Sequence, residues 1–129
     1  MRLEVCEILV TKNHLHKHPL EVIYKSQTFT SSPGSSVKLF CQVYYDPKQC
    51  DGVHAVWSHL EPAFELTDPE KYLTIVNETV LEDNRRHRQV LTEILDLTLK
   101  DEGLYQCQAT GECRRAQTVM GRLMIVFVK

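Results

Sequence analysis

The stretch KDEGLYQC at residues 100–107 constrains the fold of this chain more than any other part of the sequence. Gly103, Tyr105 and Cys107 occupy alternate positions there, and Ala109 continues the series. Because successive side chains of a β-strand point to opposite faces, these four residues share one face. The pattern therefore predicts a strand with one buried face.

The same two-residue period recurs along much of the chain, which predicts further short strands. Alternating apolar positions are found in three other segments: Val37, Leu39, Cys41 and Val43; Val53, Ala55 and Trp57; and Leu95, Leu97 and Leu99. Residues 123–128 are almost continuously apolar and are expected to form a buried last strand. Turn signals such as SSPGSS at residues 31–36 separate these segments. Many short strands predict an all-β sandwich or barrel.

Residues 78–97 admit a second interpretation. Glu, Leu and Arg dominate this segment, and its apolar residues recur near helical spacing. Several of its residues are nevertheless β-branched, among them Thr79, Val90 and Ile94. Because β-branched residues favour strands, we predict strand rather than helix here.

Cys41, Trp57 and Cys107 have the order and approximate spacing of the immunoglobulin framework, in which a cysteine on strand B, a tryptophan on strand C and a cysteine on strand F meet in the core. The chain therefore resembles a variable-type immunoglobulin domain. The resemblance implies an immunoglobulin-like two-sheet sandwich, a Cys41–Cys107 disulfide, and a Trp57 ring packed against it.

The pattern Asp101-x-Gly103-x-Tyr105-x-Cys107 completes this framework. In the family, the tyrosine two residues before the second cysteine turns inward and hydrogen-bonds to the backbone upstream. Tyr105 holds that position, and Gly103 leaves room for the chain to enter strand F. The resemblance places Asp101 in the preceding turn, where its carboxylate is expected to pair with an arginine near strand D. The candidates are Arg85, Arg86 and Arg88.

Five cysteines in 129 residues are more than a cytosolic protein usually carries, which favours disulfides and a location outside the cytosol. Buried, reduced thiols are the alternative. A Cys41–Cys107 bridge leaves Cys6, Cys50 and Cys113, which the topology of such a sandwich gathers at one end. Only two of these three can pair with each other, so one thiol is left over or bridges to another chain.

A closer resemblance involves the segment CEILVTK at residues 6–12 and the run from Cys50 to Trp57. Both are similar to parts of the B- and T-lymphocyte attenuator family of inhibitory receptors. That family bridges a cysteine before its first strand to one in the B–C loop, which implies a Cys6–Cys50 disulfide and a single thiol at Cys113. The first domain of interleukin-1 receptors implies Cys6–Cys113 instead, but it has no counterpart of Cys50. A Cys50–Cys113 bridge is the third pairing that the shared end of the sandwich permits.

The first resemblance implies the ligand-binding ectodomain of an inhibitory lymphocyte receptor at the cell surface. Its ligand would be a protein of the tumour necrosis factor receptor family, the herpesvirus entry mediator. Residues 1–129 would form a single extracellular domain, with residues 1–18 as an extension or first strand, and a single-pass membrane segment would lie outside them. The alternative is the first immunoglobulin domain of an interleukin-1-receptor-like cytokine receptor or of an adhesion molecule.

The partner-binding surface is expected to combine the first strand, residues 6–12, with the F–G loop and the start of strand G, residues 111–120. These segments are rich in hydrogen-bonding groups, and a free edge of strand G could accept a strand from the ligand. An ordinary solvated loop is the alternative. The residues assigned to binding are Glu7, Leu9, Gln106, Gln108, Arg114, Arg115, Gln117 and Thr118.

Other functions find less support in the sequence. The formal net charge of −2 gives no sign of a nucleic-acid or anionic-membrane partner. No glycine-rich nucleophile turn accompanies the cysteines and histidines, so we expect no enzyme, no catalytic residue and no cofactor. His14, His16 and His18 in HLHKHP could bind a metal on one face of a strand, but we expect a solvated loop without metal beside Pro19.

Asn77-Glu78-Thr79 is an acceptor sequence for N-linked glycosylation. Polar, turn-flanked neighbours place this sequon outside the core. We therefore predict that Asn77 carries a glycan in the native protein, and an unused sequon is the alternative.

Overall fold

The computed structural model describes residues 18–129. The predictions for Cys6, Glu7 and Leu9, and for a first strand or extension at the N-terminus, lie outside the described residues.

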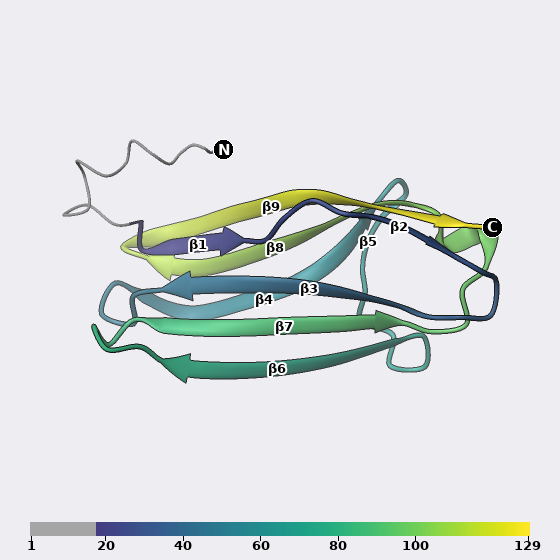
Figure 1. The fold of residues 1–129 in the computed structure, drawn as a ribbon. Coiled ribbons are helices and arrows are strands. Elements are labelled where there is room, and N and C mark those ends of the chain that lie inside the picture. The colour runs from purple at the N-terminus through teal and green to yellow at the C-terminus, as the bar shows by residue number, and fades with distance from the viewer. Residues whose placement is uncertain (1–17) are drawn as a thin grey trace.

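Nine strands and one short 3-10 helix make up the described part of the chain. In chain order they are β1 (Leu20–Ile23), β2 (Thr28–Ser31), β3 (Val37–Tyr45), β4 (Cys50–Leu60), β5 (Ala63–Glu65), β6 (Tyr72–Val80), β7 (Arg86–Ile94), η2 (Leu99–Asp101), β8 (Gly103–Cys113) and β9 (Arg115–Val128). The strands form a four-stranded sheet A, in the order β1-β3-β7-β6, and a five-stranded sheet B, in the order β2-β9-β8-β4-β5. The predicted all-β two-sheet sandwich is confirmed (Figure 1).

The core lies between the two sheets, and every second residue of β3 and nearly every second residue of β8 is buried in it. In β3 the buried positions run from Val37 to Tyr45, and in β8 they include Tyr105, Cys107 and Ala109. The two-residue period therefore identifies the inner face of both strands, as expected from the sequence. Neighbouring strands are antiparallel except β2 and β9, which run parallel at one edge of sheet B.

The turns β3–β4, β6–β7 and β8–β9 gather at one end of the sandwich, and the C-terminus lies at the other (Figure 1). We call the first of these the hairpin end. Arg85, in the β6–β7 turn, donates from Nη2 to the carbonyl of His18 at 3.1 Å. The described chain therefore begins at the hairpin end.

The strand interpretation of residues 78–97 is confirmed as far as Ile94, because β6 and β7 form an antiparallel pair. The strand predicted at residues 95–99 is wrong. Asp96 has a φ of 46°, which interrupts the extended chain. Thr98 then caps η2, and the carboxylate of Asp101 accepts from the Thr98 backbone N–H at 2.8 Å. This reciprocal capping overrides the alternation of the leucines.

Candidate functional site

The disulfide and tryptophan predicted for the core are confirmed. Cys41 and Cys107 form a disulfide between β3 and β8, and so link the two sheets. Trp57 is fully buried and lies opposite Cys107 in the β4–β8 ladder. Its indole N–H has no hydrogen-bond partner among residues 18–129, so packing alone holds the ring.

Tyr24, which the sequence pattern did not identify, completes this core. Its ring lies on Trp57, with 5.1 Å between the ring centroids. Its hydroxyl donates to the carbonyl of Arg122 and accepts from the backbone N–H of Cys107 at 3.1 Å. Burial raises the pKa of Tyr24 to about 12, although the bond from Cys107 acts to lower it. Gly121 leaves space for this ring, since a Cβ there would collide with it.

Tyr105 forms the predicted corner. Its hydroxyl donates to the carbonyl of Asp101 at 2.5 Å. Burial first, and then the negative charge of Asp101, raise the pKa of the Tyr105 phenol above its usual range. This hydroxyl therefore remains a hydrogen-bond donor over the physiological pH range.

The arginine partner predicted for Asp101 is wrong. Its carboxylate accepts from Nζ of Lys71 at 2.9 Å. Lys71 immediately precedes β6, at the same end of the sandwich as η2. The candidates Arg85, Arg86 and Arg88 lie at the other end of β7, a strand of nine residues. Such a strand spans about 30 Å, so none of them reaches Asp101.

Gly103 leaves room for the chain to enter β8, as predicted. Its φ is 143°, and a Cβ at this position would lie 2.8 Å from Nε2 of His59. His59 is only 2% exposed, and its ring nitrogens contact the carbonyls of Pro62 and Glu102 at 2.9 and 3.3 Å. The glycine is therefore needed so that His59 can pack in the core, and no sequence motif identified this histidine.

The disulfide that the family resemblance implied for Cys50 is wrong, and so is a single thiol at Cys113. Cys50 is bonded to Cys113, with 4.0 Å between their Cα atoms. The two residues lie directly opposite each other in the β4–β8 ladder, so strand pairing itself brings their side chains together. Both are buried. The structure therefore has the third pairing that the topology permitted.

We expect non-reducing peptide mapping to recover two linked peptide pairs, Cys41–Cys107 and Cys50–Cys113. Cys6 is expected in a peptide linked to neither pair, because its two predicted partners, Cys50 and Cys113, are bonded to each other. The same digest after reduction provides the unlinked reference. A peptide that joins Cys6 to Cys50 would contradict the arrangement.

The segment expected as an F–G loop is a continuous hairpin. β8 extends to Cys113 and β9 begins at Arg115, so Arg114 alone makes the turn, with a φ of 72°. The Cys50–Cys113 disulfide fixes the tip of this hairpin to the start of β4. Residues 111–120 are therefore held as two paired strands at the hairpin end.

Among residues 18–129, the residues assigned to partner binding fall in three places. Gln106 and Gln108 lie on the outer face of sheet B, because they alternate with the buried residues Tyr105, Cys107 and Ala109. Thr118 lies on the same face, because it pairs with Thr110, the next outward residue of β8. Arg114 and Arg115 are exposed at the hairpin tip. Gln117 alternates to the opposite side of β9 and is half-buried.

The distances between these groups suit a protein partner. Seven positions of β8 separate Gln106 from Cys113 at the tip, a length of about 23 Å. A surface of that length is comparable to one side of a protein–protein interface and is longer than a small-molecule site. Gln106 is partly engaged already, because its Nε2 donates to the carbonyl of Gly121 at 2.7 Å.

β9 has an unpaired outer edge over its first half. β8 occupies one edge along the strand, and β2 covers the other edge only at residues 125–128. Within residues 18–129, residues 115–123 therefore have no strand on their outer side. Such an edge presents free backbone N–H and C=O groups, except for the carbonyls of Gly121 and Arg122, which accept from Gln106 and Tyr24. It is chemically able to accept an extended segment of another molecule.

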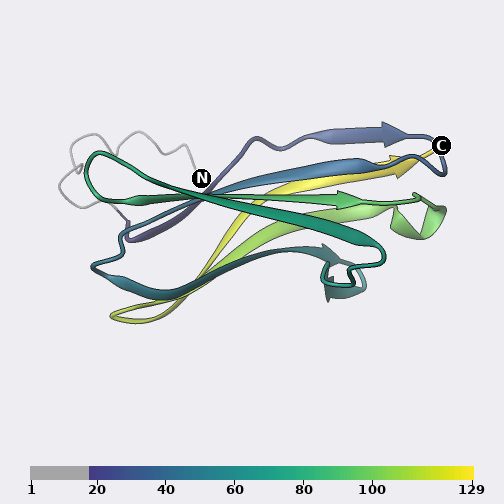
Figure 2. The same ribbon diagram turned by 90° about the horizontal axis from the view of Figure 1, so that it is seen from below.

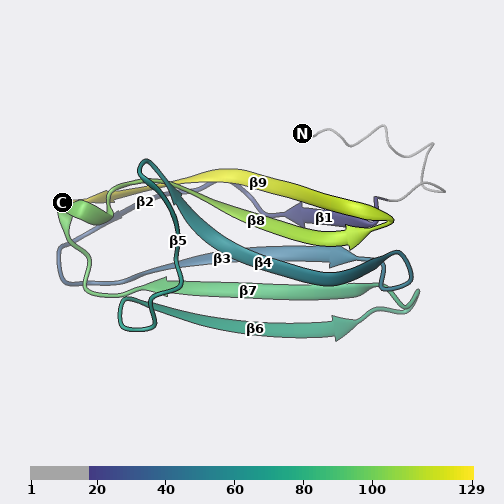
Figure 3. The ribbon, with the colours of Figure 1, turned by 180° about the vertical axis from the view of Figure 1, so that it is seen from behind.

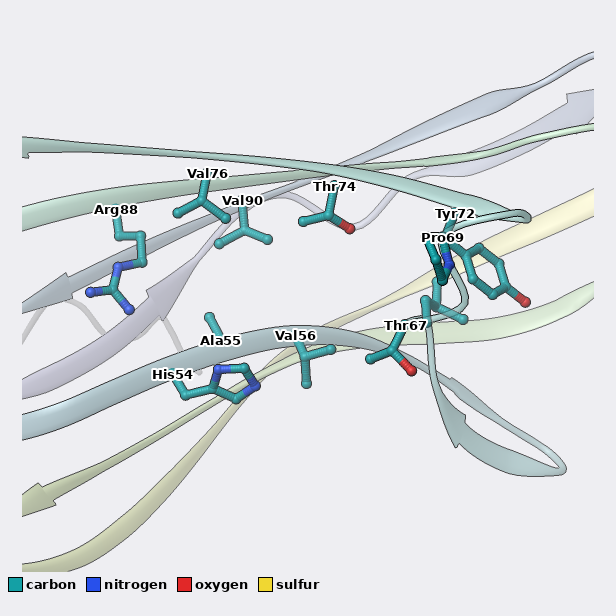
Figure 4. A pocket seen from close by; sticks show the side chains of 11 residues that line it. His54, Ala55, Val56, Thr67, Pro69, Tyr72, Thr74, Val76, Arg88 and Val90 are labelled. Atoms are coloured by element: carbon teal, nitrogen blue, oxygen red, sulfur yellow. The ribbon is translucent and has the colours of Figure 1, made fainter.

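A groove of about 410 Å³ opens on the side of the sandwich between β4 and β6. This side is open because β5 has only three residues before the chain crosses to β6 (Figure 3). Figure 4 shows Ala55 from β4 and Val76, Val90 and Arg88 from the opposite sheet facing this space. The groove is therefore mostly apolar, with one cation at its end.

Arg88 is committed to neighbours and closes the groove at that end. It donates to the carboxylate of Glu78 at 2.7 Å and to the carbonyl of Val53 at 2.5 Å. Burial acts to raise the pKa of Glu78, but hydrogen bonds from Arg88 and Tyr45 and the charges of Arg88 and Arg86 outweigh it and hold the pKa below its usual range. The bond from Arg88 to Val53 of β4 ties sheet A to sheet B, and the Arg88–Glu78 pair leaves the groove without an available charge for a ligand.

In the part of the chain that the structure describes, no three His, Cys, Asp or Glu side chains gather to hold a metal ion. Of the three histidines considered as ligands, His14 and His16 precede the described residues, and His18 is exposed. No helix within residues 18–129 has the length and apolar character needed to cross a membrane.

The two sheets, the disulfide packed beside Trp57 and the corner made by Tyr105 define the class of this domain as an immunoglobulin-like sandwich. Among solved structures, the crystal structure of the RIG-5 IG1 homodimer is similar to it, with a TM-score of 0.62. The sequences are 18% identical, and the match covers 87% of this chain and 99% of that one. At this identity the likeness concerns the fold alone. No protein-family pattern and no curated protein matches the chain.

Proposed function

We propose that this chain is the ligand-binding ectodomain of an inhibitory lymphocyte receptor, carried at the cell surface by a single-pass segment outside residues 1–129. Two disulfides in an immunoglobulin-like domain are typical of proteins outside the cytosol. The resemblance of residues 6–12 and of residues 50–57 to the B- and T-lymphocyte attenuator family supports the inhibitory role. The Cys50–Cys113 pairing differs from that family, so this part of the proposal rests on the framework and the N-terminal segment.

The proposed ligand is a protein of the tumour necrosis factor receptor family, similar to the herpesvirus entry mediator. The observation that carries a protein ligand is the unpaired edge of β9 at residues 115–123, beside a hairpin tip fixed by Cys50–Cys113. An added strand would form main-chain hydrogen bonds with this edge, and the side chains of Arg114, Arg115 and Gln117 would contribute specificity. Because a disulfide holds the edge in place, little ordering entropy opposes binding.

Replacing Arg114, Arg115 and Gln117 together by alanine is expected to weaken binding to the herpesvirus entry mediator ectodomain by about tenfold or more, because arginines are over-represented among the interface residues that dominate affinity. Surface plasmon resonance measures the affinity, and an unchanged melting temperature confirms the fold. The matched control replaces Glu21 and Lys38, on the outer face of sheet A, by alanine and is expected to bind normally.

The two parts of the proposal fail differently. Equal affinity of the triple variant and the unmutated domain would exclude the β8–β9 hairpin as the binding surface. Absence of detectable binding by the unmutated domain would exclude this partner. A full-length sequence with further immunoglobulin domains after Lys129 would favour the cytokine-receptor alternative.

An adhesion molecule is the second candidate function. The observation that favours it is a group of exposed apolar side chains on the outer face of sheet B: Leu104, Met120, Leu123 and Phe127, each 37–47% exposed. The solved RIG-5 IG1 structure is a homodimer. A contact between two copies of this chain through the outer face of sheet B would cover these residues. Analytical ultracentrifugation distinguishes the two candidates. An adhesion role of this kind requires a reversible dimer, and Leu123→Ser is expected to disrupt that dimer because Leu123 belongs to its apolar face.

A further inference from the structure

The outer face of sheet A carries an apolar row that crosses three strands. Phe40 of β3 lies opposite Leu91 of β7, which in turn lies opposite Ile75 of β6. Phe40 and Ile75 are 38% and 59% exposed. Leu73, on the same side of β6, is 48% exposed. Side chains of this size, side by side on a sheet, form an apolar patch whose exposure to water is unfavourable.

A row of amides runs directly beside the apolar row. Gln42 of β3 lies opposite Gln89 of β7, and Gln89 lies opposite Asn77 of β6. Each of these residues is two positions from its neighbour in the apolar row, so both rows are on the outer face. Gln42 Oε1 contacts Nε2 of His87 at 2.9 Å, which leaves the Gln42 amino group for another partner.

Asn77, the acceptor of the sequon, is at the outer end of the amide row. It is exposed on β6, the edge strand of sheet A. Its neighbours Val76 and Glu78 pair with Val90 and Arg88 on the inner side, where Figure 4 shows Val76 and Arg88 facing the groove. The alternation therefore directs Asn77 to the outer face, next to Ile75.

We propose that an N-linked glycan on Asn77 lies across the outer face of sheet A and covers the apolar row. From β6 to β3 the face spans two strand spacings, about 10 Å, a length that the first two sugars of an N-glycan can cover. The apolar faces of the pyranose rings pack on Ile75, Leu91 and Phe40. The sugar hydroxyl and acetamido groups exchange hydrogen bonds with the amides of Gln89 and Gln42.

This placement gives the two sheets different roles. The glycan covers sheet A and obstructs the free edge of β6, where an added strand would otherwise pair. At the hairpin end, Figure 2 shows the β6–β7 turn and the β8–β9 turn on opposite sides of the sandwich. The outer face of sheet B and the edge of β9 therefore stay open to a protein partner, and the glycan does not belong to that binding surface.

The test compares protein from a eukaryotic host with two variants that lose the sequon, N77Q and T79A, and with T79S, which retains it. Intact mass before and after glycosidase treatment reports occupancy. We expect N77Q and T79A to show a several-fold rise in fluorescence of the apolar dye ANS, a melting temperature lower by roughly 2–5 °C, and self-association in light scattering. T79S is expected to match the unmutated protein. Adding F40S and I75T to N77Q is expected to abolish the extra ANS signal.

A variant with the glycan at another position tests whether the glycan acts by covering this face or by a general increase in solubility. The variant N77Q/D83N/R85T moves the sequon to the exposed β6–β7 turn, beyond the apolar row. We expect it to carry a glycan yet to keep the high ANS signal and the lower melting temperature of N77Q. An unmodified Asn77, equal ANS binding with and without the glycan, or full rescue by the displaced glycan would each overturn the proposal. Binding to the herpesvirus entry mediator is expected to be equal in N77Q, so the two proposals fail independently.

Discussion

Replacing Trp57 by alanine is expected to lower the free energy of unfolding by about 3–5 kcal/mol. The ring is fully buried between Tyr24 and the Cys41–Cys107 disulfide, so its removal leaves a cavity that the two linked sheets cannot close. Trp57 is the only tryptophan of the chain, so urea denaturation followed by circular dichroism is the appropriate measurement.

Two controls test the physical origin of this loss. Trp57→Phe is expected to cost less, on the order of 1 kcal/mol, because it keeps much of the apolar volume and the indole N–H has no partner to lose. Phe127→Ala, on the outer face of sheet B, is expected to change stability by less than about 1 kcal/mol. A cost for Trp57→Ala as small as that of Phe127→Ala would show that the ring is not part of the core.

Removing either disulfide is expected to cost about 3 kcal/mol while the other remains. With Cys41–Cys107 intact, the second bridge closes a loop made of two segments, the nine positions from Cys41 to Cys50 and the six from Cys107 to Cys113. Opening the second bridge frees only this loop. In the chain-entropy model, a loop of about 15 residues corresponds to about 3 kcal/mol. C41A/C107A is expected to cost somewhat more than C50A/C113A, because it also removes sulfur atoms that pack beside Trp57.

Removing both bridges is expected to cost more than the sum of the two single losses. Without the second bridge, Cys41–Cys107 closes a loop of 66 residues, which corresponds to about 4 kcal/mol. The total of about 7 kcal/mol is comparable to the whole stability of a typical domain. We therefore expect cooperative urea transitions for each single-bridge variant and no cooperative transition for C41A/C107A/C50A/C113A. A stable quadruple variant would contradict this account.

The sequence by itself determined the class of fold and the centre of the core. The period of two along β3 and β8 is a local property of a half-buried strand, so it could be read without knowledge of any partner strand. The cysteine, tryptophan and tyrosine framework then identified Cys41–Cys107, Trp57 and the Tyr105 corner, because these residues occupy characteristic positions in the chain.

Only the tertiary structure decided which distant residues meet. The pairing of Cys50 with Cys113 depends on the register of β4 against β8, and all three candidate pairings were consistent with the topology. Lys71 rather than an arginine reaches Asp101, because the length of β7 separates the arginines from η2. These contacts join segments far apart in sequence, and no local pattern specifies the register that creates them.

The same reason explains the candidate binding surface. The hydrogen-bonding residues of β8 and β9 were visible in the sequence, but their separation onto an outer face, a tip and an inner side follows from the hairpin register. The apolar row on sheet A likewise exists only because Phe40, Leu91 and Ile75 are aligned across three strands. Residue types are a property of the chain, whereas their alignment into surfaces is a property of the paired sheets.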